Sequence, residues 1–279
     1  RKESSAASDV YKRQELWKTD GTEAGTSMVK DINNGYSSSS PSYLTAVGNT
    51  LYFEANNGNN GYELWKTDGT ESGTSMVKDI NNGGNGGNPY SLTAVGNTLY
   101  FVADNGNKGN ELWKTDGTEA GTSMVKDIYS GYSSSSPSSL TAVGNTLYFK
   151  ATDGNNGYEL WKTDGTEAGT SLVRDIYSGS SSSGVTEITS FNGKLYFNAD
   201  NGYVGNELFS LIETAVTTYK RFYECLVIPS SDTFDIQFDL TADVDNSLYP
   251  YSWNADINFE QIHVLEDPNS GDSDGESYT

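Results

Sequence analysis

The chain has 279 residues, with 38 Asp or Glu against 17 Lys or Arg, and its formal net charge is −21. Nucleic-acid-binding proteins need clustered Lys and Arg against the phosphates, so this charge balance argues against that class. The single cysteine, Cys225, excludes an internal disulfide framework. No apolar run approaches the roughly 20 residues of a membrane-spanning helix, so we predict no membrane insertion.

The first residues differ from those that follow. Residues 4–14 read SSAASDVYKRQ, which resembles the direct translation of a transposase-type sequencing-library adapter. We therefore interpret residues 1–14 as a non-native, adapter-derived segment and leave them out of the fold prediction. Because this segment cuts into a repeat, we expect that the native array has further repeats upstream.

From Glu15 onward the chain repeats itself with a period of 48 residues. The tripeptide ELW begins at Glu15, Glu63, Glu111 and Glu159, and a variant, ELFSL, begins at Glu207. A period of 40 to 50 residues is typical of solenoids and propellers, and the content of each repeat decides between them.

One unit, residues 138–176, divides into four short strands with the sequences SSLTAV, TLYFKA, YELWKT and TSLVRDI. Gly144-Asn145 predicts a two-residue hairpin turn with positive φ at its first position. Copy four has Asn192-Gly193 there, the pair preferred by the other twist-compatible hairpin turn. Such hairpins build antiparallel meanders, which disfavours a β-solenoid.

Both faces of these strands are apolar. Leu160 and Trp161 are adjacent and therefore point to opposite faces of their sheet. Sheets buried on both faces, repeated without helices, are what the packed blades of a β-propeller require. We predict that residues 15–214 form an all-β, propeller-like array of four-stranded antiparallel blades. The inter-blade core should then contain Trp17, Trp65, Trp113 and Trp161, with the end copies more exposed.

The end of the array bears on closure. The last copy supplies three strands, EITSF, KLYFNA and ELFSL, and no fourth strand resembling MVKDI follows. Pairing of Ser27–Ile32 with Glu207–Leu211 would close a four-bladed ring. We expect instead an open arc, truncated from a larger ring.

These residues resemble a named family. ELWKTDGTEAGTSMVKDI, residues 15–32, and LYFKATDGNNGYELW, residues 147–161, are similar to the ELWxxDGT repeat, a bacterial module of large secreted or surface proteins. The resemblance covers Glu15 to about Leu211. It implies a propeller-like fold and an extracellular or cell-surface location, and it brings no established activity or catalytic residues.

The TDGT turn invites a chemical interpretation. Its aspartate resembles those of turns in sialidase-like propellers, where the carboxylate caps backbone N–H groups of its own loop. Asp beside Gly is also ordinary turn chemistry. We therefore predict a structural role for Asp20, Asp68, Asp116 and Asp164.

Near-identical blades argue against catalysis, because general acid–base chemistry needs two groups held in different surroundings. We predict no catalytic residue and no cofactor. Calcium prefers several charged oxygen ligands, and Asp153 is replaced by Asn in the other copies. The candidate calcium ligands are Asp243 and Asp245, with an acidic surface turn as the alternative.

In an up-and-down blade, the second hairpin and the connection between blades fall on the same rim. Here those loops combine tyrosine with Ser, Gly and Asn, as in NNGYSSSSPSY. This composition is typical of binding loops, although flexible linkers share it. The predicted ligand-binding residues are Tyr36, Tyr43, Tyr62, Tyr90, Tyr132, Tyr158 and Tyr203.

The repeat dissolves after Leu211. FDIQFDL, residues 234–240, alternates apolar and polar residues like a half-buried strand. We predict a partial second β-domain over residues 215–267 and an acidic disordered linker over residues 268–279.

The functional hypothesis is an extracellular repeat protein for surface binding or adhesion. Its partner would be a glycan or a protein at the cell surface, held by the tyrosines of one rim. A passive structural spacer in a large secreted protein is the alternative. A propeller enzyme whose unique blade lies outside this sequence is the third possibility.

Overall fold

The computed structural model describes residues 14–203, 205–212 and 215–217, and in these residues all regular structure is β-strand. The strands are β1 (Leu16–Lys18), β2 (Ser27–Lys30), β3 (Ser42–Val47), β4 (Thr50–Asn56), β5 (Tyr62–Thr67), β6 (Ser75–Lys78), β7 (Tyr90–Val95), β8 (Thr98–Asp104), β9 (Asn110–Thr115), β10 (Ser123–Lys126), β11 (Ser138–Val143), β12 (Thr146–Thr152), β13 (Tyr158–Thr163), β14 (Ser171–Arg174), β15 (Thr186–Phe191), β16 (Lys194–Asp200), β17 (Asn206–Ile212) and β18 (Ala215–Thr217).

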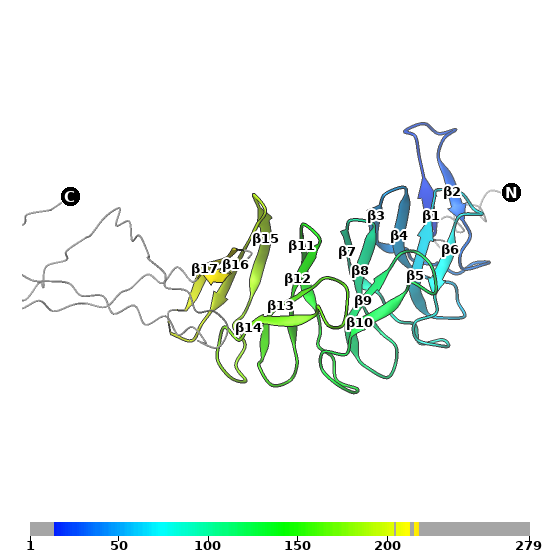
Figure 1. The fold of residues 1–279 in the computed structure, drawn as a ribbon. Helices are drawn as coiled ribbons and strands as arrows, with labels where there is room; N and C mark the ends of the chain where they lie inside the picture. The colour runs from blue at the N-terminus through cyan, green and yellow to red at the C-terminus, as the bar shows by residue number, and fades with distance from the viewer. Residues whose placement is uncertain (1–13, 204, 213–214, 218–279) are drawn as a thin grey trace, which may run out of the picture. The chain divides into compact units, whose positions relative to one another are not determined.

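Strands that are neighbours in sequence are neighbours in the sheets (Figure 1). β1 and β2 form a two-stranded sheet, and β3–β6, β7–β10, β11–β14 and β15–β18 each form a four-stranded antiparallel sheet. The first complete sheet follows directly on β2, and each further sheet follows the previous one along the chain. This arrangement confirms the predicted all-β array of blade-like antiparallel sheets.

The first hairpin of each sheet is set by a two-residue turn. Gly48, Gly96 and Gly144 all have φ of 57°, whereas Asn192 and Gly193 have φ of 50° and 72°. Positive φ at the first position alone matches a type II′ turn, and positive φ at both positions matches type I′. The fourth copy therefore changes the turn type and keeps the hairpin.

The core lies between successive sheets. In the cluster between β3–β6 and β7–β10, Tyr52 and Leu64 of the first sheet pack with Leu99, Phe101 and Trp113 of the second. Equivalent clusters join the other successive sheets. Each four-stranded sheet that lies between two other sheets is thus buried on both faces, as its adjacent apolar residues require.

The tryptophans show what this packing does. Trp65, Trp113 and Trp161 are 6–7% exposed, which confirms their predicted place in the core, whereas Trp17 is 57% exposed. Trp17 lies on the first sheet, and no described residue covers its face from the upstream side. At the other end Phe209 stays buried, because its face packs on the preceding sheet.

Lysines on the third and fourth strands add polar contacts between sheets. Lys66 Nζ donates to the carbonyl of Gly117 at 2.8 Å, and Lys78 Nζ donates to the carbonyl of Thr122 at 3.0 Å. Gly117 lies in the DGT turn of the next sheet, and Thr122 directly precedes β10 of the same sheet. Equivalent lysine contacts are made by Lys18, Lys30 and Lys126.

The first and last sheets are not paired with each other in the described residues. β2 pairs with β1, and β17 pairs with β16 and β18. The ring that Ser27–Ile32 would close is therefore not formed. The sheets stand in an open series, as expected.

The last sheet corrects one expectation. The sequence predicts three strands there, but β18 provides a fourth, with Ile212 opposite Ala215 and Ser210 opposite Thr217. β18 lacks the MVKDI pattern and follows β17 after residues 213–214 instead of a TDGT turn. Backbone pairing needs no side-chain pattern, which is why sequence inspection missed it. The sheet thus extends past residue 214, where the array was predicted to end.

Several predicted segments lie outside the described residues: the rest of the partial β-domain, the acidic segment 268–279, and residues 1–13 of the adapter-like stretch. Gln14 is described. Its N–H donates to Ser38 Oγ, and its carbonyl accepts from the N–H of Ser40, both at 2.9 Å. The carbonyl of Asn110 likewise accepts from the N–H of Ser136. Gln14 therefore takes part in the repeat's backbone hydrogen bonding, which does not depend on its side chain.

We expect Phe101→Ala to lower the free energy of unfolding by about 3–5 kcal/mol, measured by urea titration. Phe101 is fully buried and stacks on Trp113 with ring centroids 6.5 Å apart, so its loss leaves a cavity between two sheets. Phe191→Ala is the matched control, because Phe191 is exposed and its loss should cost roughly 0.5 kcal/mol or less. Equal effects of the two changes would contradict the inter-sheet core.

Candidate functional site

The second hairpin of each sheet meets the loops between sheets on one rim of the array. Asn60, between β4 and β5, donates from Nδ2 to Asp79 Oδ2, just after β6, at 2.6 Å. In the next sheet Lys108 Nζ contacts Asp127 Oδ2, also at 2.6 Å. A Cβ at Gly61 would collide with the backbone of the loop after β6. The loops of this rim therefore pack on one another closely.

The glutamate of each ELW tripeptide is buried beneath this rim. Glu111 Oε2 accepts from the N–H of Ile128 at 3.1 Å, and Oε1 accepts from the N–H of Ser135 at 2.9 Å. The donors lie 17 and 24 residues further along the chain, in the loop that leads to the next sheet. The same pair of bonds is made by Glu15, Glu63 and Glu159.

The loop held by the glutamate is also bonded to the next sheet. The carbonyl of Ser135 accepts from the N–H of Thr152, at the end of β12, at 3.1 Å. The carbonyl of Gly87 accepts from the N–H of Asp104, at the end of β8, at 3.0 Å. Each buried carboxylate thus positions a loop that connects two sheets.

Burial disfavours the ionised form of these glutamates. It raises the pKa of Glu63 and of Glu111 from the usual 4.5 to about 7, although the hydrogen bonds that each carboxylate accepts oppose the shift. Burial also raises the pKa of Glu159.

Three of the seven predicted tyrosines stand on rim loops and are strongly exposed. The exposed fraction is 71% for Tyr36, 84% for Tyr132 and 90% for Tyr203. Tyr36 and Tyr132 follow β2 and β10, and Tyr203 lies in the second hairpin of the last sheet. Tyr132 is near enough to Lys108 to contribute to its raised pKa, of which the hydrogen bond to Asp127 is the main cause.

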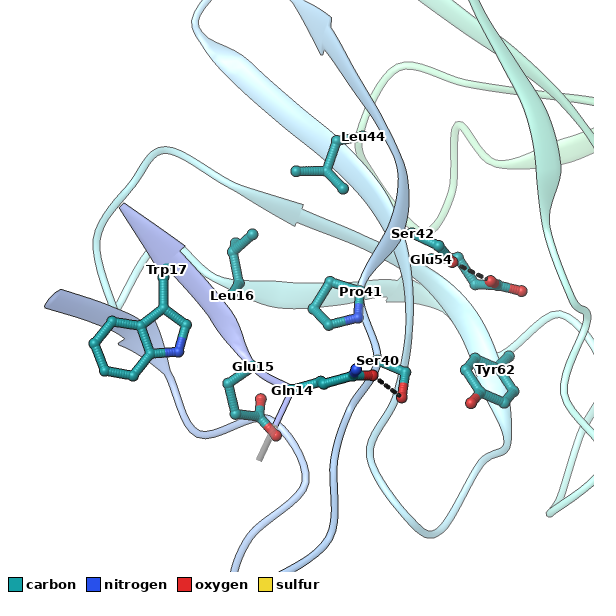
Figure 2. A pocket seen from close by; sticks show the side chains of 10 residues that line it. All are labelled: Gln14, Glu15, Leu16, Trp17, Ser40, Pro41, Ser42, Leu44, Glu54 and Tyr62. Carbon is teal, nitrogen blue, oxygen red and sulfur yellow. Dashed lines mark hydrogen bonds between the residues drawn. The ribbon is translucent and has the colours of Figure 1, made fainter. Parts of the chain in front are cut away.

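The other four tyrosines lie in the first two residues of strands. Tyr43 and Tyr158 are exposed, whereas Tyr62 and Tyr90 are partly buried. Burial raises the pKa of Tyr90, and the nearby hydroxyls of Tyr43 and Tyr158 raise it further. Tyr43 and Tyr158, from the sheets before and after that of Tyr90, therefore each lie near enough to Tyr90 to act on it electrostatically. Tyr62 lines a separate pocket beside β1 (Figure 2).

The aspartates of the TDGT turns bond within their own turns. Asp116 Oδ1 accepts from the N–H of Thr118 at 2.8 Å and from its Oγ1 at 2.7 Å. The side-chain bond and then the backbone bond lower the pKa of Asp116. These turns join the third and fourth strands, so they lie at the opposite rim from the tyrosines. The same two bonds are made by Asp20, Asp68 and Asp164.

The described residues contain no group of three His, Cys, Asp or Glu side chains placed to hold a metal ion. Asp153 Oδ1 accepts from the N–H groups of Asn155 and Asn156 in its own hairpin. The candidate calcium ligands Asp243 and Asp245 lie outside the described residues. No helix in the described part of the chain could cross a membrane.

Sequence reasoning missed two features of the rim. It did not identify the buried role of the ELW glutamates, for which the signal is an acidic residue kept in every copy beside two buried apolar residues. It also passed over Tyr129 and Tyr177. Their rings lie against Gly154 and Gly202 of the second hairpins, where a Cβ would collide with them.

No protein-family model and no curated protein matches the chain. Partly similar solved structures include a mutant puromycin hydrolase complexed with PGG, with 14% identity over 66% of this chain and 29% of the hydrolase, at a TM-score of 0.40. A prolyl endopeptidase shows 13% identity over 69% of this chain and 29% of the endopeptidase, at a TM-score of 0.40. TolB from Acinetobacter baumannii shows 14% identity over 70% of this chain and 50% of TolB, at a TM-score of 0.36. The chain spans half of the length of TolB and less than a third of the length of the other two proteins. These similarities say nothing about activity.

The raised pKa values of Glu63 and Glu111 predict an unusual pH dependence of stability. Between 4.5 and about 7 the folded protein holds protons that the unfolded chain has released. Unfolding then releases protons, so the free energy of unfolding falls as pH rises through this window and levels off above it. Thermal unfolding should show a higher Tm at about pH 5 than at about pH 7.5.

The double variant Glu63→Gln/Glu111→Gln should weaken this dependence, whatever its effect on the absolute Tm, and the raised pKa of Glu159 accounts for the part that remains. Asp116→Asn is the control, because the pKa of Asp116 is lowered from 3.8 and lies outside the window. A Tm of the unmodified protein that rises between pH 5 and 7.5 would contradict the assignment.

Proposed function

We propose that this protein binds a glycan or a protein at the bacterial cell surface through the tyrosine-bearing loops of one rim. The observation that carries the proposal is the exposure of Tyr36, Tyr132 and Tyr203 on loops of the same rim. The extracellular location rests on the resemblance to the ELWxxDGT repeat.

Support for binding comes first from the rigidity beneath the exposed rings. The loops that carry Tyr36 and Tyr132 are each held by a buried glutamate, Glu15 and Glu111, through backbone N–H groups. A flexible linker would lack such anchors. Tyrosine has few rotatable bonds, so a ring on an anchored loop offers contact area with little entropy to lose on binding.

The chemistry around the rings suits a polar ligand. Serine and asparagine side chains flank the tyrosines in both kinds of rim loop, and they can donate and accept hydrogen bonds. Lys108 adds a cationic group beside Tyr132. Stacking aromatic faces with adaptable hydrogen-bonding groups nearby fits sugar rings as well as protein surfaces.

Repetition extends the surface. Tyr43, Tyr90 and Tyr158 come from three successive sheets, and Tyr43 and Tyr158 each lie near enough to Tyr90 to act on it electrostatically. A ligand with repeating units can therefore contact more than one sheet. Linked weak contacts of this kind raise overall affinity without requiring a deep pocket.

The test is binding to an array of bacterial and host polysaccharides and to intact bacterial surfaces. The triple variant Tyr36→Ser/Tyr132→Ser/Tyr203→Ser should lose affinity by about tenfold or more, because three contacts worth roughly 0.5–1.5 kcal/mol each are removed. The Tyr→Phe triple variant should keep most of the affinity, since the rings remain.

Phe191→Ser is the matched control, because it removes an exposed aromatic ring from the end of β15, at the opposite rim. Its binding should equal that of the unmodified protein. Undiminished binding by the Tyr→Ser triple variant, or no binding by the unmodified protein to any of these surfaces, would reject the proposal.

A further inference from the structure

The two-stranded sheet of β1 and β2 differs from the other sheets along the edge of β1 that faces away from β2, which we call its inner edge. In the complete sheets the equivalent strands β5, β9 and β13 pair with β4, β8 and β12 over six residues each. In the described residues β1 pairs with β2 alone. The backbone groups on its inner edge are therefore unpaired in this part of the chain, and such an edge is a template for another strand.

An apolar face adjoins this edge. Leu99 and Leu147 are fully buried, whereas Leu51, at the same position in the first complete sheet, is partly exposed. Leu44, on β3, is 52% exposed, whereas Leu92 packs in a core cluster. The exposed surface on β3 and β4 therefore consists of positions that are covered in later sheets.

In the later sheets these positions are covered by the first two strands of the preceding sheet, which we call its inner hairpin. Val47 and Tyr52, from β3 and β4, pack in one cluster with Leu92 and Leu99. The inner hairpin is thus the element that fits the exposed face, and its second strand is the one that pairs with the edge.

The glycine of the DGT turn also lacks, in the first complete sheet, a neighbour that it has in later sheets. Tyr52 places its hydroxyl over Gly117, and Tyr100 places its hydroxyl over Gly165, in the DGT turn of the following sheet. Gly69 occupies the same position in the first complete sheet, and no described side chain lies over it. The tyrosine hydroxyl that covers this turn glycine in the later sheets therefore has no counterpart at Gly69 among the described residues.

A pocket marks the place (Figure 2). It is lined on one side by Leu16 and Trp17 of β1 and on another by Leu44, with the hydrogen bond from Ser42 Oγ to Glu54 Oε2 at 2.6 Å nearby. The pocket therefore joins the unpaired edge to the exposed apolar face.

The residues that stand 48 positions before β4 do not supply the pattern that this pocket fits. Residues 2–8 read KESSAAS, where residues 50–56 read TLYFEAN. The Leu, Tyr and Phe of the repeat are replaced by Glu, Ser and Ser.

We propose that the inner edge of β1 and the adjoining face of β3 and β4 form an acceptor site for a β-hairpin that has the sequence pattern of the repeat's own inner strand pair. The second strand of the hairpin pairs with β1 by backbone hydrogen bonds. Its tyrosine and the valine of its first strand cover the face that carries Leu44 and Leu51. This is strand addition to an exposed sheet edge, with side-chain pockets that give specificity.

The probe is a fluorescent peptide with the sequence of residues 138–152, SSLTAVGNTLYFKAT. We expect saturable binding by fluorescence anisotropy, together with slower hydrogen exchange at the β1 amides. A control peptide in which the tyrosine and the phenylalanine are serine should bind at least tenfold more weakly, because the apolar contacts are lost.

Leu44→Asp in the protein should also weaken peptide binding at least tenfold. Leu208→Asp is the matched control, because Leu208 is an exposed leucine on β17 of the last sheet, and it should leave binding unchanged. Both side chains are exposed, so neither change threatens folding.

Three results would overturn the proposal: no saturable binding, equal binding by the Leu44→Asp variant, or protection that falls on strands other than β1. Slow exchange at β1 before peptide is added would also overturn it, because the edge would already be covered. Sedimentation velocity would then show whether a second copy or the chain's own residues cover it.

Discussion

The structure depends on a glutamate side chain buried between sheets. The glutamate of each ELW tripeptide accepts backbone N–H groups 17 and 24 residues downstream, and the loop that it holds bonds to the second strand of the next sheet. A buried carboxylate is costly unless hydrogen-bonded, so its presence requires that loop conformation. One acidic residue per repeat therefore couples the position of each sheet to that of the next.

The same repetition divides the two rims between two tasks. At one rim the DGT turn bonds internally through Asp116 and accepts lysine ammonium groups from the preceding sheet, as at Gly117. Its polar groups are used in holding sheets together. At the other rim the loops are anchored from beneath by Glu111, and Tyr132 is left exposed. The exposed side chains of this rim can therefore vary without loss of the contacts that maintain the array.

Each sheet is completed by its neighbours, so the ends of the array differ physically from its middle. Trp113 is buried because a sheet precedes it, and Trp17 is exposed because none does in the described residues. Phe209 keeps its cover, whereas Leu208, on the opposite face of β17, is exposed. The exposed surfaces at the ends are therefore copies of internal interfaces, and their chemistry is already defined by the repeat.

The sequence by itself determined the strands, the hairpin turns and their order, because these follow from local features such as Gly144-Asn145 and the adjacent apolar pair Leu160 and Trp161. Only the tertiary structure showed that Glu111 is buried, since its partners lie far along the chain and an acidic residue in a strand otherwise indicates solvent. It alone brought Tyr43 and Tyr90 together, because they belong to different sheets. It also revealed β18, because backbone hydrogen bonds pair strands without a side-chain pattern to announce them.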